Sequence, residues 1–214
     1  MGDYLSSDHN EREITSFSNK LANKLLDDKQ IKNVNNSFTS HNLTSEQLLR
    51  MLEKNAYKLG ESNSDNIVDS IKRSKYITIT LGMNDILPCL TFTSNTQELK
   101  YDAQLVERKL EILTQNYYEI IEMIKDINAN AKIYVVSYYF PYPWISKDLK
   151  EDSLVVFNKL NDVLKNVSYN TSVNFVDISD VSHTVFLVNP TDIYLNQYGQ
   201  NYTFEEMVKF FEID

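Results

Sequence analysis

The side chains best placed to do chemistry stand beside three of the chain's four glycines. Only four glycines occur in 214 residues, well below the usual frequency of about 7 %, so each is expected to meet a need of the backbone. The three segments are Gly2-Asp3-Tyr4-Leu5, Gly82-Met83-Asn84-Asp85 and Tyr194-Leu195-Asn196-Gln197-Tyr198-Gly199. They offer carboxylates, a side-chain amide that can donate to an oxyanion, and phenols, whose pKa of about 10 makes them poor bases at neutral pH.

Serine–histidine chemistry has few other candidates. Ser6 and Ser7 follow the first glycine segment, where they could act as nucleophiles or simply cap the turn into the first helix. The three histidines are His9, His41 and His183, and their spacing does not suit a metal site. The single cysteine, Cys89, excludes an internal disulfide and a cysteine-based zinc site. We therefore expect no metal and no cofactor.

Composition favours one folded domain and argues against a nucleic-acid partner. The chain is 42 % hydrophobic and 12 % aromatic, which is not typical of disorder. Thirty acidic and 21 basic residues leave a net charge of −9, and this field repels phosphate backbones. No apolar stretch approaches the roughly 20 residues that a membrane helix needs. We expect a single domain over residues 1–214, with no transmembrane segment and no nucleic-acid partner.

Hydrophobic periodicity predicts strands that alternate with helices. Short apolar runs predict strands near 31–37, 76–81, 132–138 and 173–177. Apolar steps of three and four predict helices over about 13–28 and 99–128, and a last helix from about Thr203. Thr44 and Gln47 have the spacing of a capping box and open a further helix. This order predicts a three-layer α/β domain, a parallel sheet with helices on both faces, and function in the loops after the strands.

The three glycine segments resemble the sequence blocks of the SGNH/GDSL hydrolase family, in its lipase/acylhydrolase branch. The strand that runs into Gly82-Met83-Asn84-Asp85 is the most specific match, and together the blocks span nearly the whole chain. The resemblance implies a flavodoxin-like sheet and the chemistry of a serine ester hydrolase. In that chemistry a serine attacks an acyl carbonyl, a histidine oriented by an aspartate takes its proton, and an oxyanion hole binds the developing charge.

When the family's motifs are matched residue by residue, their positions are present but most of the catalytic residue types are replaced. Tyr4 stands at the nucleophile position, Tyr194 at the histidine position, and Thr191 or Asp192 at the aspartate position. Asn84 and Asn42 stand at oxyanion-hole positions, with Asn42 in place of a glycine. The two tyrosine replacements would each lower the rate by orders of magnitude. We therefore expect a pseudoenzyme that binds a lipid, an acylated envelope molecule, a glycan or a partner protein.

Two alternatives stay open beside that expectation. The first is an active esterase or lipase that uses a displaced serine and one of the histidines. The second takes Asn84 as an ordinary helix cap. For Tyr4 and Tyr194 we expect packing against each other, which would plug the old pocket, rather than a catalytic role. Tyr142 and Trp144 lie in a proline-rich aromatic loop and are candidates for ligand or partner binding, with core packing as the plainer alternative.

The beginning of the sequence departs from the family pattern. The family's first strand precedes its Gly-Asp block, whereas Asp3 is the third residue here. We expect that strand either to lie upstream of residue 1 or to have been lost, and its absence would leave unpaired strand edges and a gap in the core. If an N-terminal segment is missing, the protein would be extracellular or membrane-anchored, and otherwise cytoplasmic.

Overall fold

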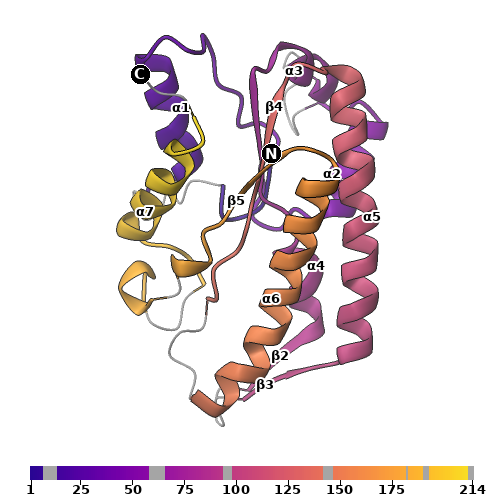
Figure 1. Ribbon diagram of the computed structural model, residues 1–214, viewed down its shortest axis with the longest axis vertical. Coiled ribbons are helices and arrows are strands. Elements are labelled where there is room, and N and C mark those ends of the chain that lie inside the picture. Colours follow the sequence, from indigo (N-terminus) through magenta and orange to yellow (C-terminus); the bar gives the residue numbers. More distant parts are fainter. Residues whose placement is uncertain are drawn as a thin grey trace.

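A parallel sheet forms the centre of the protein. The computed structural model describes residues 1–6, 14–57, 66–93, 98–141, 147–181, 183–189 and 193–211. Strands β1 (Tyr76–Ile79), β4 (Lys132–Val136) and β5 (Asn174–Val176) are parallel and lie in the order β1-β4-β5. Helices α1 and α7 lie to one side of these strands and α5 and α6 to the other (Figure 1). The expected α/β class with a parallel sheet is confirmed.

The helices follow the predicted order, with some boundaries displaced. They are α1 (Phe17–Asp27), α2 (Ser45–Glu53), α3 (Ile67–Arg73), α4 (Met83–Ile86), α5 (Ala103–Ile127), α6 (Lys147–Asn170) and α7 (Gln197–Val208). Thr44 and Gln47 form the expected capping box at α2. The last helix begins earlier than predicted, because the Asn196 side chain accepts from the backbone N–H groups of Tyr198 and Gly199. No helix in the described ranges is both long and apolar enough to cross a membrane.

The first residues of the chain lie in the plane of the sheet, beside β1. Gly2 forms parallel bridges to Thr39 on one side and to Thr80 on the other. The amino group of Met1 donates to the carbonyl of Thr78 at 2.8 Å. A Cβ on Gly2 would lie 1.9 Å from Oγ1 of Thr80, so this position accepts only glycine without a rearrangement.

The strand predicted at 31–37 is wrong. Residues 31–36 form no strand or helix, and pairing on this side of the sheet is confined to the bridge at Thr39. The segment is rich in Asn and Ser, and such side chains satisfy backbone groups locally, as Asn35 does when it accepts from the N–H of Ser37. The backbone hydrogen bonds of this segment to Gly2 involve only Phe38 and Ser40.

An antiparallel ribbon was not predicted. Strand β2 (Leu90–Thr93) pairs with β3 (Glu98–Tyr101), in a register that places Leu90 opposite Tyr101. Figure 1 places this ribbon at one end of the molecule, where α5 begins. The predicted helix over 99–128 therefore begins later, at Ala103, where the Asp102 side chain accepts from the N–H of Leu105.

A buried tyrosine and a glycine hold the turn after β1. The hydroxyl of Tyr117 on α5 donates to the carbonyl of Leu81 at 2.8 Å and accepts from its N–H at 3.2 Å. Gly82 then turns the chain with φ of 133°, in the region that L side chains rarely adopt. A Cβ on Gly82 would lie 2.9 Å from Cδ1 of Leu160 and 3.2 Å from Cδ2 of Leu113. The turn that presents Asn84 thus depends on glycine.

We expect Gly82→Ala to lower the free energy of unfolding by about 2 kcal/mol, because it adds a disfavoured φ and a clash with Leu160. Urea unfolding followed by circular dichroism measures the loss. Ser172→Gly is the matched control, since exposed Ser172 has φ of 54° and gains conformational freedom instead. Its stability should stay within about 1 kcal/mol of the wild type. Equal stability of Gly82→Ala and wild type would contradict the role given to this turn.

Candidate functional site

Two tyrosines from opposite ends of the sequence pack against each other. Tyr4 follows the sheet-plane segment and is 3 % exposed, and half-buried Tyr194 lies just before α7. Their ring centroids are 5.5 Å apart with an interplanar angle of 86°, an edge-to-face geometry that stabilises aromatic pairs. The ring of Tyr138 lies 6.5 Å from that of Tyr4 on another side. Aromatic rings therefore occupy the place where the two positions meet.

Asn84 directs its side-chain amide at the backbone of the loop before α2. Its Nδ2 donates to the carbonyls of His41 at 2.9 Å and Leu43 at 3.0 Å. The ring of His41 in turn lies 6.3 Å from the ring of Tyr194. The helix-cap alternative for Asn84 is wrong, since the N-cap of α4 is Gly82 and no side chain caps it. Asn84 instead ties the loop before α2 to the turn after β1.

Asp85 holds the N-terminus of α2. Its carboxylate accepts from the N–H of Ser45 at 3.1 Å and from Oγ of Ser45 at 2.6 Å. Asn116 on α5 donates its amide to the same Oγ at 2.8 Å. Burial raises the pKa of Asp85, and the hydrogen bonds from Ser45 oppose this shift. Sequence reasoning missed Ser45 and Asn116, because neither adjoins a glycine segment.

Asp3 is fully buried and faces Tyr138 rather than Tyr194. One carboxylate oxygen accepts from the N–H of Leu5 at 3.1 Å, and the other accepts from the hydroxyl of Tyr138. Burial raises the pKa of Asp3 to about 7, against the hydrogen bond from Tyr138, which favours the charged form. The pKa of Tyr138 is raised well above its usual value, first by burial and then by the Asp3 charge. Asp3 and Tyr138 thus form a buried pair, and neither side chain presents an acid or a base to solvent.

The displaced-serine alternative finds no pair in the described residues. Oγ of Ser6 is 2.7 Å from Oγ1 of Thr80 and buried, and no described histidine is hydrogen bonded to it. His183 is exposed, with its ring 6.1 Å from that of Phe186. Asn42 is exposed in a turn. Six further candidates, Ser7, His9, Tyr142, Trp144, Thr191 and Asp192, lie outside the described residues.

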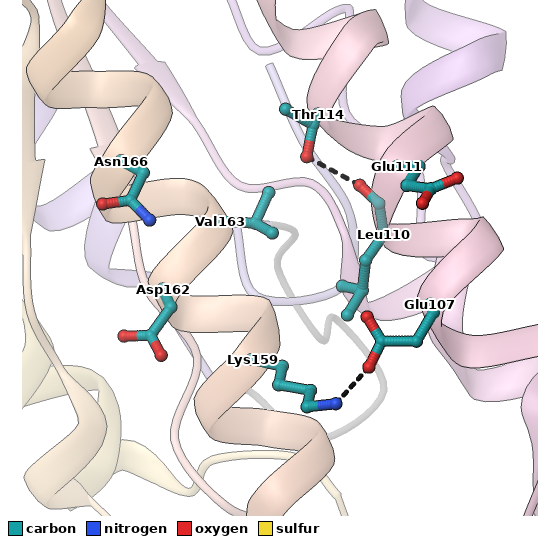
Figure 2. A pocket seen from close by; sticks show the side chains of 8 residues that line it. All are labelled: Glu107, Leu110, Glu111, Thr114, Lys159, Asp162, Val163 and Asn166. Atoms are coloured by element: carbon teal, nitrogen blue, oxygen red, sulfur yellow. Dashed lines mark hydrogen bonds and ion pairs between the residues drawn. The ribbon is translucent and has the colours of Figure 1, made fainter. Parts of the chain in front are cut away.

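Two cavities lie away from the tyrosine pair, and neither is lined by Tyr4, Asn84 or Tyr194. The smaller, of about 250 Å³, is a groove between α5 and α6. Figure 2 shows Lys159 of α6 reaching across it to Glu107 of α5 in an exposed ion pair. The larger, of about 790 Å³, lies beside the N-terminal segment. Within the described ranges, no group of three His, Cys, Asp or Glu side chains could hold a metal ion.

Comparisons with known proteins agree with this architecture. A sequence model of the GDSL-like lipase/acylhydrolase family matches residues 3–201. The uncharacterized protein YpmR of Bacillus subtilis (strain 168) is 24 % identical over 184 residues, which cover 85 % of this chain and 66 % of YpmR. The chain thus spans just under two thirds of that relative.

Two solved structures share the fold. The lipase Lip_vut3 from a goat rumen metagenome superposes with a TM-score of 0.74 at 18 % identity, covering 100 % of this chain and 97 % of its own. Axe2, an acetylxylan esterase from Geobacillus stearothermophilus, superposes with a TM-score of 0.61 at 14 % identity, covering 99 % and 92 %. At these identities the likeness establishes the fold alone.

We expect Asp3→Asn to remove a pH dependence of stability. Because the pKa of Asp3 is raised by folding, its contribution is fully present below about pH 4 and is lost as the pH rises through about 7. Relative to Asp3→Asn, the wild type should therefore lose about 2 kcal/mol of unfolding free energy between pH 5.5 and pH 8. Urea unfolding of both proteins at the two pH values measures this difference.

Asp177→Asn is the control with the opposite sign. Partial burial opposes ionisation of Asp177, but hydrogen bonds from Ser179 and Ser137 outweigh it and lower the pKa. The stability that Asp177 contributes is lost only as the pH falls below about 4, so its difference from the wild type should be the same at pH 5.5 and pH 8. A constant difference for Asp3→Asn as well would rule out a raised pKa at Asp3.

Proposed function

Because the chain belongs to the GDSL-like lipase/acylhydrolase family, we propose that it is a catalytically degenerate member that binds a partner without hydrolysing an ester. The observation that carries this proposal is the packing of the Tyr4 ring against the Tyr194 ring, whose centroids are 5.5 Å apart. These residues stand where the resemblance places the nucleophile and its base. Rings that pack at these positions favour a filled site over one that is open to a substrate carbonyl.

The replacements also lack the chemistry of acyl transfer. A tyrosine oxygen lies about 6 Å from its backbone along the ring, so Tyr4 cannot present a hydroxyl where a serine would. A nucleophile needs an adjacent base to take its proton, and the partner of Tyr4 is a second phenol. The described charged neighbour, Asp3, accepts from Tyr138 and is buried away from Tyr194. Among the described residues, neither proton transfer of the serine mechanism has a group placed to perform it.

The side-chain amide expected in the oxyanion hole is also engaged elsewhere. The amide of Asn84 would have to donate to the negative oxygen of a tetrahedral intermediate. Here it donates to the carbonyls of His41 and Leu43. Stabilising an oxyanion would require breaking both bonds, which removes the preorganisation that makes such a group effective. Asn84 therefore contributes to the loop structure.

We assign the remaining role to binding, with a protein as the favoured partner. Among the structures that share the fold are a lipase and an acetylxylan esterase, so an ancestral pocket would suit a lipid, an acyl ester or an acetylated glycan. The tyrosine pair occupies that pocket's place, which disfavours a small ligand there. A protein partner can instead use surface away from the pair.

We expect no labelling by a fluorophosphonate probe and no hydrolysis of p-nitrophenyl acetate or butyrate above the buffer rate, because tyrosines stand at the nucleophile and base positions and Ser6, the described candidate serine, is hydrogen bonded to Thr80. Mass spectrometry of the intact protein measures labelling, and an active esterase of the family is the positive control. A stoichiometric adduct on one serine would establish the displaced-serine esterase instead. In that case Ser6→Ala and Ser7→Ala, compared for loss of the adduct, identify which serine reacts.

We expect the double variant Tyr4→Ser, Tyr194→His to be less stable than the wild type by about 3 kcal/mol, because it removes the buried Tyr4 ring, replaces the Tyr194 ring by a smaller imidazole and leaves a cavity. Thermal and urea unfolding measure the loss. The matched control is Tyr4→Phe, Tyr194→Phe, which keeps both rings and should lose less than half as much. Wild-type stability in the Ser/His variant would mean that the rings do not fill the site, and the proposal would fail.

A further inference from the structure

Lysine and arginine side chains gather at the end of the protein where the parallel strands begin. Residues 28–36, which follow α1, and residues 72–75, which lead into β1, contain five cations and one acid. The five cations are Lys29, Lys32, Lys72, Arg73 and Lys75. The acid, Asp28, is ion paired with Lys24 at 2.8 Å. Because the whole protein carries a net charge of −9, its charge is unevenly distributed.

Hydrogen bonds hold these segments side by side at the start of the sheet. The hydroxyl of Tyr76 on β1 donates to Oε1 of Gln30 at 2.9 Å. On the next strand, the N–H of Lys132 donates to the carbonyl of Lys75 at 2.9 Å. Figure 1 shows α3 and the last turn of α5 at this same, upper end of the molecule. We call five exposed side chains at this end the basic patch: Lys29, Lys32, Arg73, Lys75 and Lys132.

The helix dipole explains only a part of this clustering. Lys72 and Arg73 occupy the last turn of α3, where a cation complements the negative end of the helix dipole. Lys72 is also paired with Asp69 at 3.7 Å, and for this reason it is left out of the patch. The other four members of the patch lie in the loop after α1 or where β1 and β4 begin, outside any helix. Their gathering therefore needs another explanation.

Exposed apolar side chains accompany the cations. Val34, in the loop after α1, is 40 % exposed, and Phe210 is 42 % exposed. The neighbouring Phe211 holds Phe210 at this end, because the Phe211 ring lies 5.0 Å from the ring of Tyr76 and stacks on that of Tyr134 at 4.5 Å. Lysines mixed with exposed apolar side chains suit a bilayer surface, where the cations meet the headgroups and the apolar groups enter the interface.

The patch has the form of a surface rather than of a pocket for one small anion. Its members come from separate segments of the chain, and all five side chains are exposed. Exposed, spread cations bind a single anion weakly, whereas an extended anionic surface can meet all of them at once. Each basic residue near such a surface raises the partition coefficient by about fivefold. Several weak contacts of this kind together give appreciable binding.

We propose that the basic patch docks the protein on a membrane surface that contains anionic phospholipids, with Val34 and Phe210 entering the headgroup layer. The strands then begin near the bilayer, and Tyr4 and Tyr194, beyond the carboxyl end of β1, face away from it. A docked protein would thus keep the opposite end of the sheet accessible to a protein partner. The inference goes beyond the proposed function and does not depend on it.

The test is sedimentation of the protein with vesicles of phosphatidylcholine, alone or with about 30 % phosphatidylglycerol. Partitioning onto the anionic vesicles should be at least tenfold stronger, and raising the salt from about 0.1 M to about 0.5 M should abolish the difference. Lys32→Gln, Lys75→Gln should weaken binding at least tenfold. The matched control is Lys100→Gln, Lys159→Gln, which makes the same change in net charge at exposed positions on β3 and α6 and should stay within twofold of the wild type.

Several outcomes would overturn this proposal. One is equal partitioning onto neutral and anionic vesicles, or no binding to either. Another is an equal loss of binding in the two double variants, because the attraction would then follow net charge rather than the patch. Tight binding of long-chain polyphosphate that anionic vesicles do not displace would assign the patch to a soluble polyanion instead.

The two proposals fail separately. Fluorophosphonate labelling with normal binding to anionic vesicles would overturn the loss of catalysis and leave the membrane assignment intact. No labelling and no vesicle binding would do the reverse.

Discussion

The contact between Gly2 and Thr80 determines where every candidate residue near the N-terminus lies. The two backbones are bridged, and a methyl group on Gly2 would fall 1.9 Å from Oγ1 of Thr80. This approach brings the first residues into the plane of the sheet, so that Asp3 and Tyr4 emerge at the carboxyl end of β1. Side chains that follow parallel strands meet at the same edge of a sheet. Tyr4 therefore reaches Tyr194 although nearly the whole chain separates them.

The polar side chains near that edge make structural hydrogen bonds. Asp3 accepts from Tyr138, Asp85 accepts from Ser45, and Asn84 donates to two loop carbonyls. Buried polar groups are costly unless they are hydrogen bonded, and each of these has a partner from a distant part of the sequence. Residues that match catalytic motifs in the sequence thus form hydrogen bonds that connect loops within the protein.

The sequence predicts what depends on local rules. The Thr44–Gln47 capping box formed as expected, because both of its hydrogen bonds span three residues. The packing of Tyr4 on Tyr194 also followed, since the resemblance aligned both with one site. The strand predicted at 31–37 was wrong because side chains in this Asn- and Ser-rich segment satisfy backbone groups locally, as Asn35 does for the N–H of Ser37. The partners of Asp3 and Asn84 depend on long-range packing, for which the sequence offers no local signal.

The filled site and the open groove lie on the two ends of one short segment. Met1 bonds to Thr78 at the edge of the groove, and Tyr4 packs on Tyr194 three residues later. Three residues of extended chain span about 10 Å, so the bond of Met1 to Thr78 lies within about that distance of the tyrosine pair. Gly2 and Asp3 are buried and bonded to both neighbours and to Tyr138, which leaves little freedom to absorb a shift at Met1. One short hydrogen-bonded segment therefore forms part of the groove lining through Met1 and positions Tyr4 against Tyr194.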